Sequence, residues 1–369
     1  MPKTKPIQVT KSFLPPIEEY TNLLQTVWDT QQLTNGGPLL LKLIDELKSF
    51  LSLPQLLVTT NGTLSLQLAI KALALTGDII TTPFSYIASS SSIVWEGCRP
   101  VFVDIEPDSW CIDAAKIEEA ITAQTTAILA THVFGNPCDV ATIKAIADKH
   151  NLKIIYDGAH AFGVQYLGES IFNFGDISIC SFHATKIFHT AEGGCLITQD
   201  ESLLKKLIWL HNLGHSGQED FYGSGINAKA TELQAAMGLA VLPYVNTLIE
   251  CRKQRAIMYD ALLKKSNLQH IQTREGASRN YAYYPVLFEN KETMLTVKKA
   301  LNQQQIFPRR YFYPSLNTVE YLKGKPMPIA EDVASRILCL PLYHDLELAD
   351  ITRISDIINA LCDEELIQR

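Results

Sequence analysis

Two apolar runs decide the fold: KIIYDGAHAFG at residues 153–163 and ISICSFHATK at residues 177–186. Each begins with a short stretch rich in β-branched residues, which is typical of buried strands in a parallel sheet. Ligands of such sheets bind outside the carboxyl ends of the strands, where these runs place Asp157 and Ser181. Lys186 follows shortly after Ser181. We therefore expect all three side chains at one edge of the sheet.

Strand-like runs alternate with helical periodicity between Leu56 and Ile197. This alternation predicts an α/β domain with a mostly parallel sheet flanked by helices. The last third of the chain changes to long charged helices, which indicates a smaller α+β domain. We expect a large domain over residues 12–250 and a small one over 251–369, on which residues 1–11 pack. The runs are LLVTT, DIITTP, PVFVDI, TTAILATHV, KIIYDG, ISICSF and GCLIT.

The composition is that of a well-packed globular protein, with 47% apolar and 19% charged residues. A net charge of −7 without a basic cluster argues against a nucleic-acid partner. The chain has no signal-peptide pattern and no apolar run of roughly 18 to 20 residues, so we expect a cytoplasmic protein without a membrane partner. The eight cysteines are scattered, which argues against a disulfide framework or a metal site.

A carboxylate at a strand end and a lysine nearby suit the chemistry of pyridoxal 5'-phosphate (PLP). The carboxylate can pair with a protonated ring nitrogen, and the lysine can form a Schiff base with the cofactor and later move a proton. Each residue alone has an ordinary alternative, because strand-end Asp residues often serve turns and most lysines are solvated. The order and spacing of Asp157 and Lys186 favour the cofactor.

Several motifs resemble the DegT/DnrJ/EryC1/StrS family of sugar aminotransferases, and the resemblance runs over essentially the whole chain. The first of these motifs are DGAHAFG, SFHATK and EGGCLIT. The resemblance implies the PLP-dependent transferase fold of type I, with a seven-stranded sheet in the large domain and a smaller C-terminal α+β domain. It also implies PLP as the cofactor, with Lys186 and Asp157 as the catalytic residues.

Other motifs of the family imply further cofactor contacts. NGTLSL at residues 61–66 resembles the turn that holds the cofactor phosphate, which assigns Gly62 and Thr63 to that role and lets the Ser181 hydroxyl join them. An anion at a helix N-terminus is favourable, and glycine allows the backbone to approach closely. TPFSYIASSSSI places Tyr86 against the cofactor face, although a strand-end aromatic can also simply pack in a core.

Three polar residues have roles implied by the resemblance alone. His160 stands where the family has a Gln or His near the phenolic oxygen of the cofactor, and His183 either lines the sugar pocket or packs. Asn227, in GSGINAKATELQAAMGL, corresponds to the residue that reaches the cofactor phosphate of the neighbouring subunit, so a homodimer with shared active sites is expected. Lys229 replaces the common arginine, whose bidentate geometry lysine cannot reproduce.

The segment PRRYFYPSLN at residues 308–317 resembles the part of the small domain that contributes to the nucleotide-sugar site. It makes Arg309, Arg310, Tyr311 and Tyr313 the candidates for binding the diphosphate and the sugar. Guanidinium groups suit diphosphate oxygens because they donate two aligned hydrogen bonds. Surface arginines beside a core strand are the alternative interpretation.

The resemblance implies transfer of an amino group from L-glutamate to a nucleotide-linked 4-keto-6-deoxy sugar. The subgroup most resembled makes dTDP-4-amino-4,6-dideoxy-D-glucose for O-antigen and other surface polysaccharides. The galacto epimer, a 3-amino sugar and a non-catalytic PLP-binding regulator remain alternatives. A related dehydratase has His in place of the lysine, so Lys186 favours transamination. A nicotinamide-dependent sugar enzyme would require a G-x-G-x-x-G-like turn after its first strand, and the sequence has none there.

Overall fold

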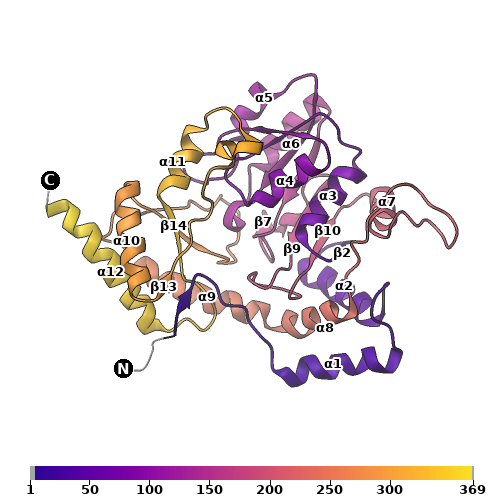
Figure 1. Cartoon of the computed structure of the whole chain (residues 1–369), viewed down its shortest axis with the longest axis horizontal. Coiled ribbons are helices and arrows are strands. Elements are labelled where there is room, and N and C mark those ends of the chain that lie inside the picture. The colour runs from indigo at the N-terminus through magenta and orange to yellow at the C-terminus, as the bar shows by residue number, and fades with distance from the viewer. Residues whose placement is uncertain (1–4, 368–369) are drawn as a thin grey trace.

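The computed structural model describes residues 5–367 and is organised around a seven-stranded sheet (Figure 1). Each of its strands comes from one of the seven apolar runs identified in the sequence. β10 is antiparallel to both of its neighbours, and the other strands pair in parallel. The expected mostly parallel sheet is confirmed. Its order is β2 (Leu57–Thr59), β10 (Gly194–Ile197), β9 (Ile177–Ser181), β6 (Lys153–Asp157), β5 (Thr125–Thr131), β3 (Asp78–Thr81) and β4 (Arg99–Phe102).

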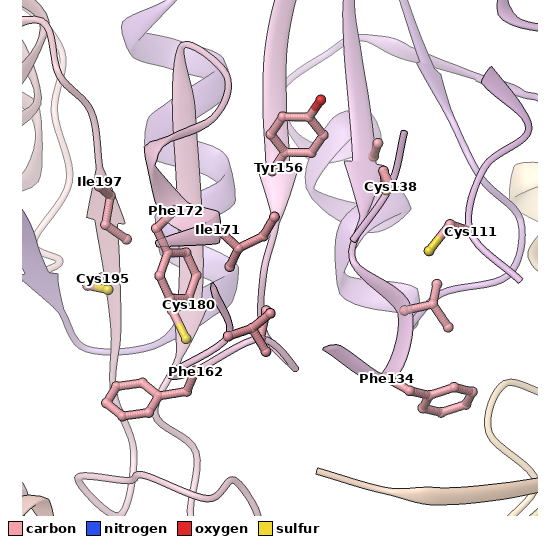
Figure 2. Close-up of a cluster of buried hydrophobic side chains, with 14 of the residues drawn as sticks. Cys111, Phe134, Cys138, Tyr156, Phe162, Ile171, Phe172, Cys180, Cys195 and Ile197 are labelled. Atoms are coloured by element: carbon pink, nitrogen blue, oxygen red, sulfur yellow. The ribbon is translucent and has the colours of Figure 1, made fainter. Parts of the chain in front are cut away.

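Helices cover both faces of this sheet, so alternate strand residues enter different cores. Ile79 and Ile155 belong to the cluster under α3 and α7, whereas Ile80 and Ile154 belong to the larger cluster that includes α2 and α6. Figure 2 shows part of the larger cluster. The helices of this part are α1 (Ile17–Thr30), α2 (Pro38–Leu51), α3 (Gly62–Ala72), α4 (Ile87–Trp95), α5 (Ile117–Ala120), α6 (Val140–His150), α7 (Glu201–His211) and α8 (Glu232–Val241).

The C-terminal part has its own apolar core, formed by helices and a three-stranded sheet. β1 (Ile7–Gln8), near the N-terminus, pairs in parallel with β13 (Ile306–Phe307) (Figure 1). The expected boundary between residues 250 and 251 falls inside α9 (Val245–Leu262). The other elements are β7 (Gln165–Tyr166), β8 (Glu169–Ser170), β11 (Gln269–His270), β12 (Tyr284–Leu287), α10 (Lys291–Gln303), α11 (Pro328–Arg336), β14 (Ile337–Leu340) and α12 (Leu348–Ile367).

Three further sequence expectations concern the chain ends, membrane-spanning helices and the cysteines. Residues 1–4 and 368–369 of the expected domain ranges lie outside the described residues. Within residues 5–367, no helix combines the length and the apolar composition that crossing a bilayer requires. Six of the eight cysteines are buried, as small apolar side chains commonly are.

A buried carboxylate connects α8 to the start of α2. Glu232 is 1% exposed, and its two oxygens accept hydrogen bonds from the backbone N–H groups of Leu39 and Leu40 at 2.8 and 2.9 Å. These N–H groups belong to the first helical turn, which has no intrahelical acceptors for them. A Cβ at Gly37 would lie 2.5 Å from the Glu232 carboxyl carbon, so a side chain there would collide with this cap.

A second buried carboxylate connects the large sheet to the C-terminal part. Asp104 follows β4 and accepts hydrogen bonds from the backbone N–H groups of Ile329 and Ala330 at 3.0 and 2.8 Å. It thereby caps the first turn of α11 across 225 residues of sequence. The position of α11 relative to the sheet is fixed by this contact.

His132, directly after β5, is fully buried and neutral. Its ring stacks on Tyr156 with 4.7 Å between centroids, and its Nδ1 accepts a hydrogen bond from the Cys138 N–H at 3.1 Å. Burial lowers the pKa of His132 to about 3, with a smaller contribution from Arg274. The folded protein therefore does not protonate this imidazole at mildly acidic pH.

We expect His132 to make the fold sensitive to acid. Between pH 6.5 and pH 3 the unfolded chain binds a proton at this residue and the folded chain does not, so stability falls as the pH falls. From pH 6.5 to pH 5 this amounts to about 2 kcal/mol. Denaturant unfolding of wild type and His132→Asn at both pH values measures it, because Asn cannot be protonated. An identical loss in both proteins would contradict the prediction.

Candidate active site

Four strand ends meet at one edge of the large sheet. Gly194, the first residue of β10, pairs with Thr59 at the end of β2 and with Ser181 at the end of β9. Asp157 is the last residue of β6, which runs parallel to β9 beside it. The motifs that the sequence separates by more than 100 residues are therefore adjacent here.

The turn after β2 forms a cradle for an anion. The Asn61 side chain caps α3 through a 2.8 Å hydrogen bond, and the helix geometry leaves the N–H groups of Gly62 and Thr63 directed beyond its first turn. A Cβ at Gly62 would lie 3.1 Å from the Ser181 Cβ. One at Gly194 would lie 2.7 Å from the Gly62 nitrogen. This close packing at a helix N-terminus fits a phosphate group.

Asp157 is held at both carboxylate oxygens. It is 5% exposed; Oδ1 accepts a 3.0 Å hydrogen bond from the Ala159 N–H, and Oδ2 accepts one of 2.6 Å from the Ser89 hydroxyl. Donors on both oxygens stabilise the anion and fix its plane, as pairing with a protonated ring nitrogen requires. Ser89 was not identified from the sequence. The available signal was its place one helical turn after Tyr86, in a run of serines.

His160 is a neutral hydrogen-bond donor in the site. Its Nδ1 accepts the N–H of Phe134 at 3.2 Å, so in the neutral ring Nε2 carries the hydrogen. Burial, followed by the nearby charge of Lys186, lowers the pKa of His160 well below its usual value. The ring also stacks on Phe312, with 5.6 Å between centroids and 1° between planes. Phe312 is a second site residue that sequence reasoning missed.

Lys186 projects toward the same region. Its Nζ donates a hydrogen bond to the Tyr283 hydroxyl at 3.4 Å. The pKa of the Cys180 thiol, raised to about 12 mainly by burial, also responds to both Lys186 and Asp157, so all three groups are close. His183 lies further out and is 46% exposed in its side chain, with Nε2 3.6 Å from Glu192. The sugar-pocket role of His183 stays a prediction.

The aromatic residues expected at the site lie near one another. Burial raises the pKa of Tyr311 to about 12, and the neighbouring phenols of Tyr283 and Tyr86 contribute. Tyr86, at the N-cap of α4, is 60% exposed and so has a free face for stacking. The Tyr311 and Tyr283 rings meet edge to face at 5.5 Å. Tyr311 in the segment 308–317 therefore contacts Tyr283, whose hydroxyl in turn contacts Lys186.

The two candidate arginines differ in their surroundings. Arg309 is exposed, and its backbone bridges to Cys339. Arg310 donates from Nη2 to the Ser335 carbonyl at 2.8 Å, near the end of α11, and stacks over the Tyr313 ring at 3.4 Å. Arg310 thus already has protein partners, whereas Arg309 is open to solvent. Binding of a diphosphate by either one stays a prediction.

Lys229 ties down the loop that carries Asn227. Its Nζ donates to the Asn212 side-chain oxygen at 2.7 Å, and burial lowers the pKa of Lys229. Its backbone also bridges to Thr59, and the Thr60 N–H donates to the carbonyl of residue 228 at 2.9 Å. Asn227 itself is exposed. The lysine found in place of the family's arginine therefore joins the loop to its own subunit.

The comparison with known proteins agrees with this geometry. The profile of the DegT/DnrJ/EryC1/StrS aminotransferase family matches residues 16–359. The chain belongs to this family. It is 40% identical over 349 residues to the dTDP-4-amino-4,6-dideoxy-D-glucose transaminase of Shigella dysenteriae, covering 93% of this chain and 95% of the relative. The Escherichia coli protein of the same name is 36% identical, over 96% and 98% of the two chains.

Other relatives and solved structures are less similar in sequence. The GDP-perosamine synthase of Escherichia coli O157:H7 is 32% identical, over 81% of this chain and 84% of the relative. Among solved structures, DesI with its TDP-sugar product superposes with a TM-score of 0.94 at 29% identity, covering 99% of this chain and 96% of DesI. The protein is thus a PLP-dependent sugar aminotransferase with the type I fold.

We expect Lys186 to be the lysine that binds PLP. Borohydride reduction of the cofactor-loaded protein should leave one pyridoxyl label, on the peptide that contains Lys186, because only a primary amine beside Asp157 and His160 can form the bond. Peptide mapping by mass spectrometry measures this. Lys186→Ala should give no label, and Lys229→Ala should be labelled as wild type. A label on another lysine would refute the assignment.

Proposed function

We propose that this protein transfers the amino group of L-glutamate to the 4-keto carbon of a dTDP-linked 4-keto-6-deoxyglucose in the cytoplasm. The product is dTDP-4-amino-4,6-dideoxy-D-glucose, a precursor of O-antigen and related surface polysaccharides. The main support is that two relatives with this activity in their names match over more than 90% of the chain, at 40% and 36% identity.

Other products in the same chemical class are the alternatives. The galacto epimer requires proton delivery to the opposite face of the sugar, and a 3-amino sugar requires a shifted position of the keto carbon. The GDP-perosamine synthases are less similar to this chain, at 32% identity for the Escherichia coli O157:H7 protein. The higher identity to the dTDP-sugar enzymes favours the dTDP-4-amino gluco product.

The residues described above suit this reaction. When bound, PLP supplies an electron sink for negative charge at the carbon that exchanges its amino group. Asp157, with both oxygens hydrogen-bonded, would pair with the ring nitrogen. His160 would donate from Nε2 to the phenolic oxygen, and the cradle at Gly62 and Thr63 would hold the phosphate. Lys186 would bind the cofactor and then carry the proton to and from the reacting carbon.

We propose that the active unit is a homodimer in which Asn227 completes the site of the partner subunit. Large apolar side chains are exposed on α1, α2 and α8 and on the segment between α1 and α2, and exposed apolar surface of this kind suits an interface. Asn227 lies exposed on the loop held by Lys229, which suits a contact with a second chain. The exposed apolar residues are Ile17, Trp28, Leu33, Leu41 and Leu233.

The proposed substrate can be tested in the reverse direction with amino-sugar nucleotides and 2-oxoglutarate. We expect dTDP-4-amino-4,6-dideoxy-D-glucose to have a kcat/KM at least about tenfold above its galacto epimer, a dTDP-3-amino sugar and GDP-perosamine. The reason is that a polar pocket discriminates strongly when a hydroxyl or amino group is misplaced. Stopped-flow loss of the PLP absorbance on mixing the PLP-loaded enzyme with each amino-sugar nucleotide measures each rate. Preference for another sugar would refute this substrate and leave the enzyme class unchanged.

Hybrid dimers test the shared site. Lys186→Ala and Asn227→Ala subunits should each be impaired alone, and mixing them should restore activity, because one of the two sites in a hybrid then has both residues intact. Activity after subunit exchange, confirmed by differently tagged chains, is the measurement. As a control, mixing Lys186→Ala with Asp157→Asn should restore nothing, since both residues belong to one subunit's site. Failure of the first mixture to recover activity would contradict the proposal.

A further inference from the structure

Tyr283 is a buried phenol beside the reactive lysine. It is 8% exposed, and its hydroxyl oxygen lies 3.4 Å from the Lys186 Nζ. The tyrosine comes from the segment just before β12, 97 residues from the lysine along the chain. Hydrogen bonds that act in catalysis are often long before substrate binds. The distance is therefore compatible with a working contact.

The backbone that carries Tyr283 is fixed by two buried side chains. The preceding residue, Ala282, donates its N–H to the Asn280 side-chain oxygen at 3.1 Å. Its carbonyl accepts a hydrogen bond from the fully buried guanidinium of Arg252 at 3.2 Å. Both polar groups of residue 282 are thus satisfied by side chains, which leaves little freedom at residue 283.

The same segment is also connected to the strand-end loop that carries the cofactor-binding candidates. Asn280 is 3% exposed and donates from its amide to the carbonyls of His160 at 2.8 Å and Phe162 at 3.0 Å. The Tyr283 ring meets the His160 ring edge to face at 4.9 Å. Any shift of His160 would therefore move Tyr283 with it, and the phenol keeps its position relative to both His160 and Lys186.

We propose that Tyr283 is a catalytic residue whose phenol oxygen accepts a hydrogen bond from the protonated nitrogen of Lys186 and orients that nitrogen for proton transfer. The proposal rests on the assignment of Lys186 as the PLP-binding lysine. A hydrogen bond to a charged donor is stronger than one to a neutral donor, so the phenol favours the protonated state of the nitrogen. The contact lies at a partly buried position.

Other titratable groups lie around Lys186. They are Asp157 on β6, His160 on the following loop, the Cys180 thiol on β9, and Tyr311 beyond the Tyr283 ring. His160 and Cys180 remain neutral near pH 7, because burial lowers the pKa of the first and raises that of the second. All of these groups stay in place in Tyr283→Phe. Removing one hydroxyl should thus give a partial, measurable shift.

The test uses the cofactor-loaded enzyme and Tyr283→Phe, which keeps the ring and removes the hydroxyl. The absorbance of bound PLP is titrated with pH, and its midpoint reports proton loss from the Lys186 nitrogen. We expect the midpoint to fall by roughly half a unit to one unit, because the protonated state loses an acceptor. The glutamate half-reaction should slow by about ten- to a hundredfold, with little change in KM.

Tyr284→Phe is the matched control. Its hydroxyl donates to Asp260 at 2.6 Å inside the C-terminal part, away from Lys186, so the midpoint should remain at the wild-type value. If Tyr283→Phe folds poorly, fluorotyrosine at position 283 retains the packing and weakens the acceptor, and a smaller shift in the same direction is expected. An unchanged midpoint overturns the proposal even where turnover falls, and so does an equal shift in Tyr284→Phe.

A failure of the Tyr283 proposal can be distinguished from a failure of the Lys186 assignment. If borohydride labels a lysine other than Lys186, the proposed site is wrong and the role of Tyr283 falls with it. If the label is on Lys186 and the midpoint does not move, only the role of Tyr283 is overturned. The two measurements use the same protein preparation.

Discussion

The active site depends on the close approach of the turn at Asn61 and Gly62 to the strand ends at Ser181 and Gly194. A Cβ at either glycine would lie about as close as backbone and side-chain atoms can tolerate, or closer. Because neither glycine has a Cβ, the start of α3 can pack directly on β9 and β10. The N-terminus of that helix thus lies at the sheet edge where Asp157 and Ser181 end neighbouring strands, a position that suits an anion.

Around this cradle, each reactive group is held by a neighbour from another element. Ser89 on α4 fixes the Asp157 carboxylate, and the Phe134 N–H selects the tautomer of His160. Such supporting contacts matter because a site that is displaced by about an ångström loses much of its rate. The two groups also have opposite hydrogen-bonding roles: Asp157 accepts hydrogen bonds at both oxygens, whereas the buried His160 is neutral and donates from Nε2.

The sheet and the main motifs were predictable from the sequence because they depend on local patterns. The seven apolar runs have the composition of buried strands, and parallel strands place their carboxyl ends together, which brings Asp157 and Ser181 to one edge. Ser89, Tyr283 and Phe312 were not found, because their importance arises from contacts across 68 to 97 residues or between stacked rings. The hydrogen bond from Arg310 to the Ser335 carbonyl could not be predicted either, since a sequence does not show which backbone groups face a guanidinium.

The buried hydrogen bonds between the large sheet and the C-terminal part also constrain how substrate enters. Asp104 caps α11, and Asn280 binds the carbonyls of His160 and Phe162, so swinging the C-terminal part away from the sheet would break these hydrogen bonds. Each of them stabilises the closed arrangement by about 0.5–1.5 kcal/mol net of water, so together they oppose such an opening. We therefore expect substrate to enter without a large movement of the C-terminal part, along the surface where the rings of Tyr86 and Tyr313 are exposed.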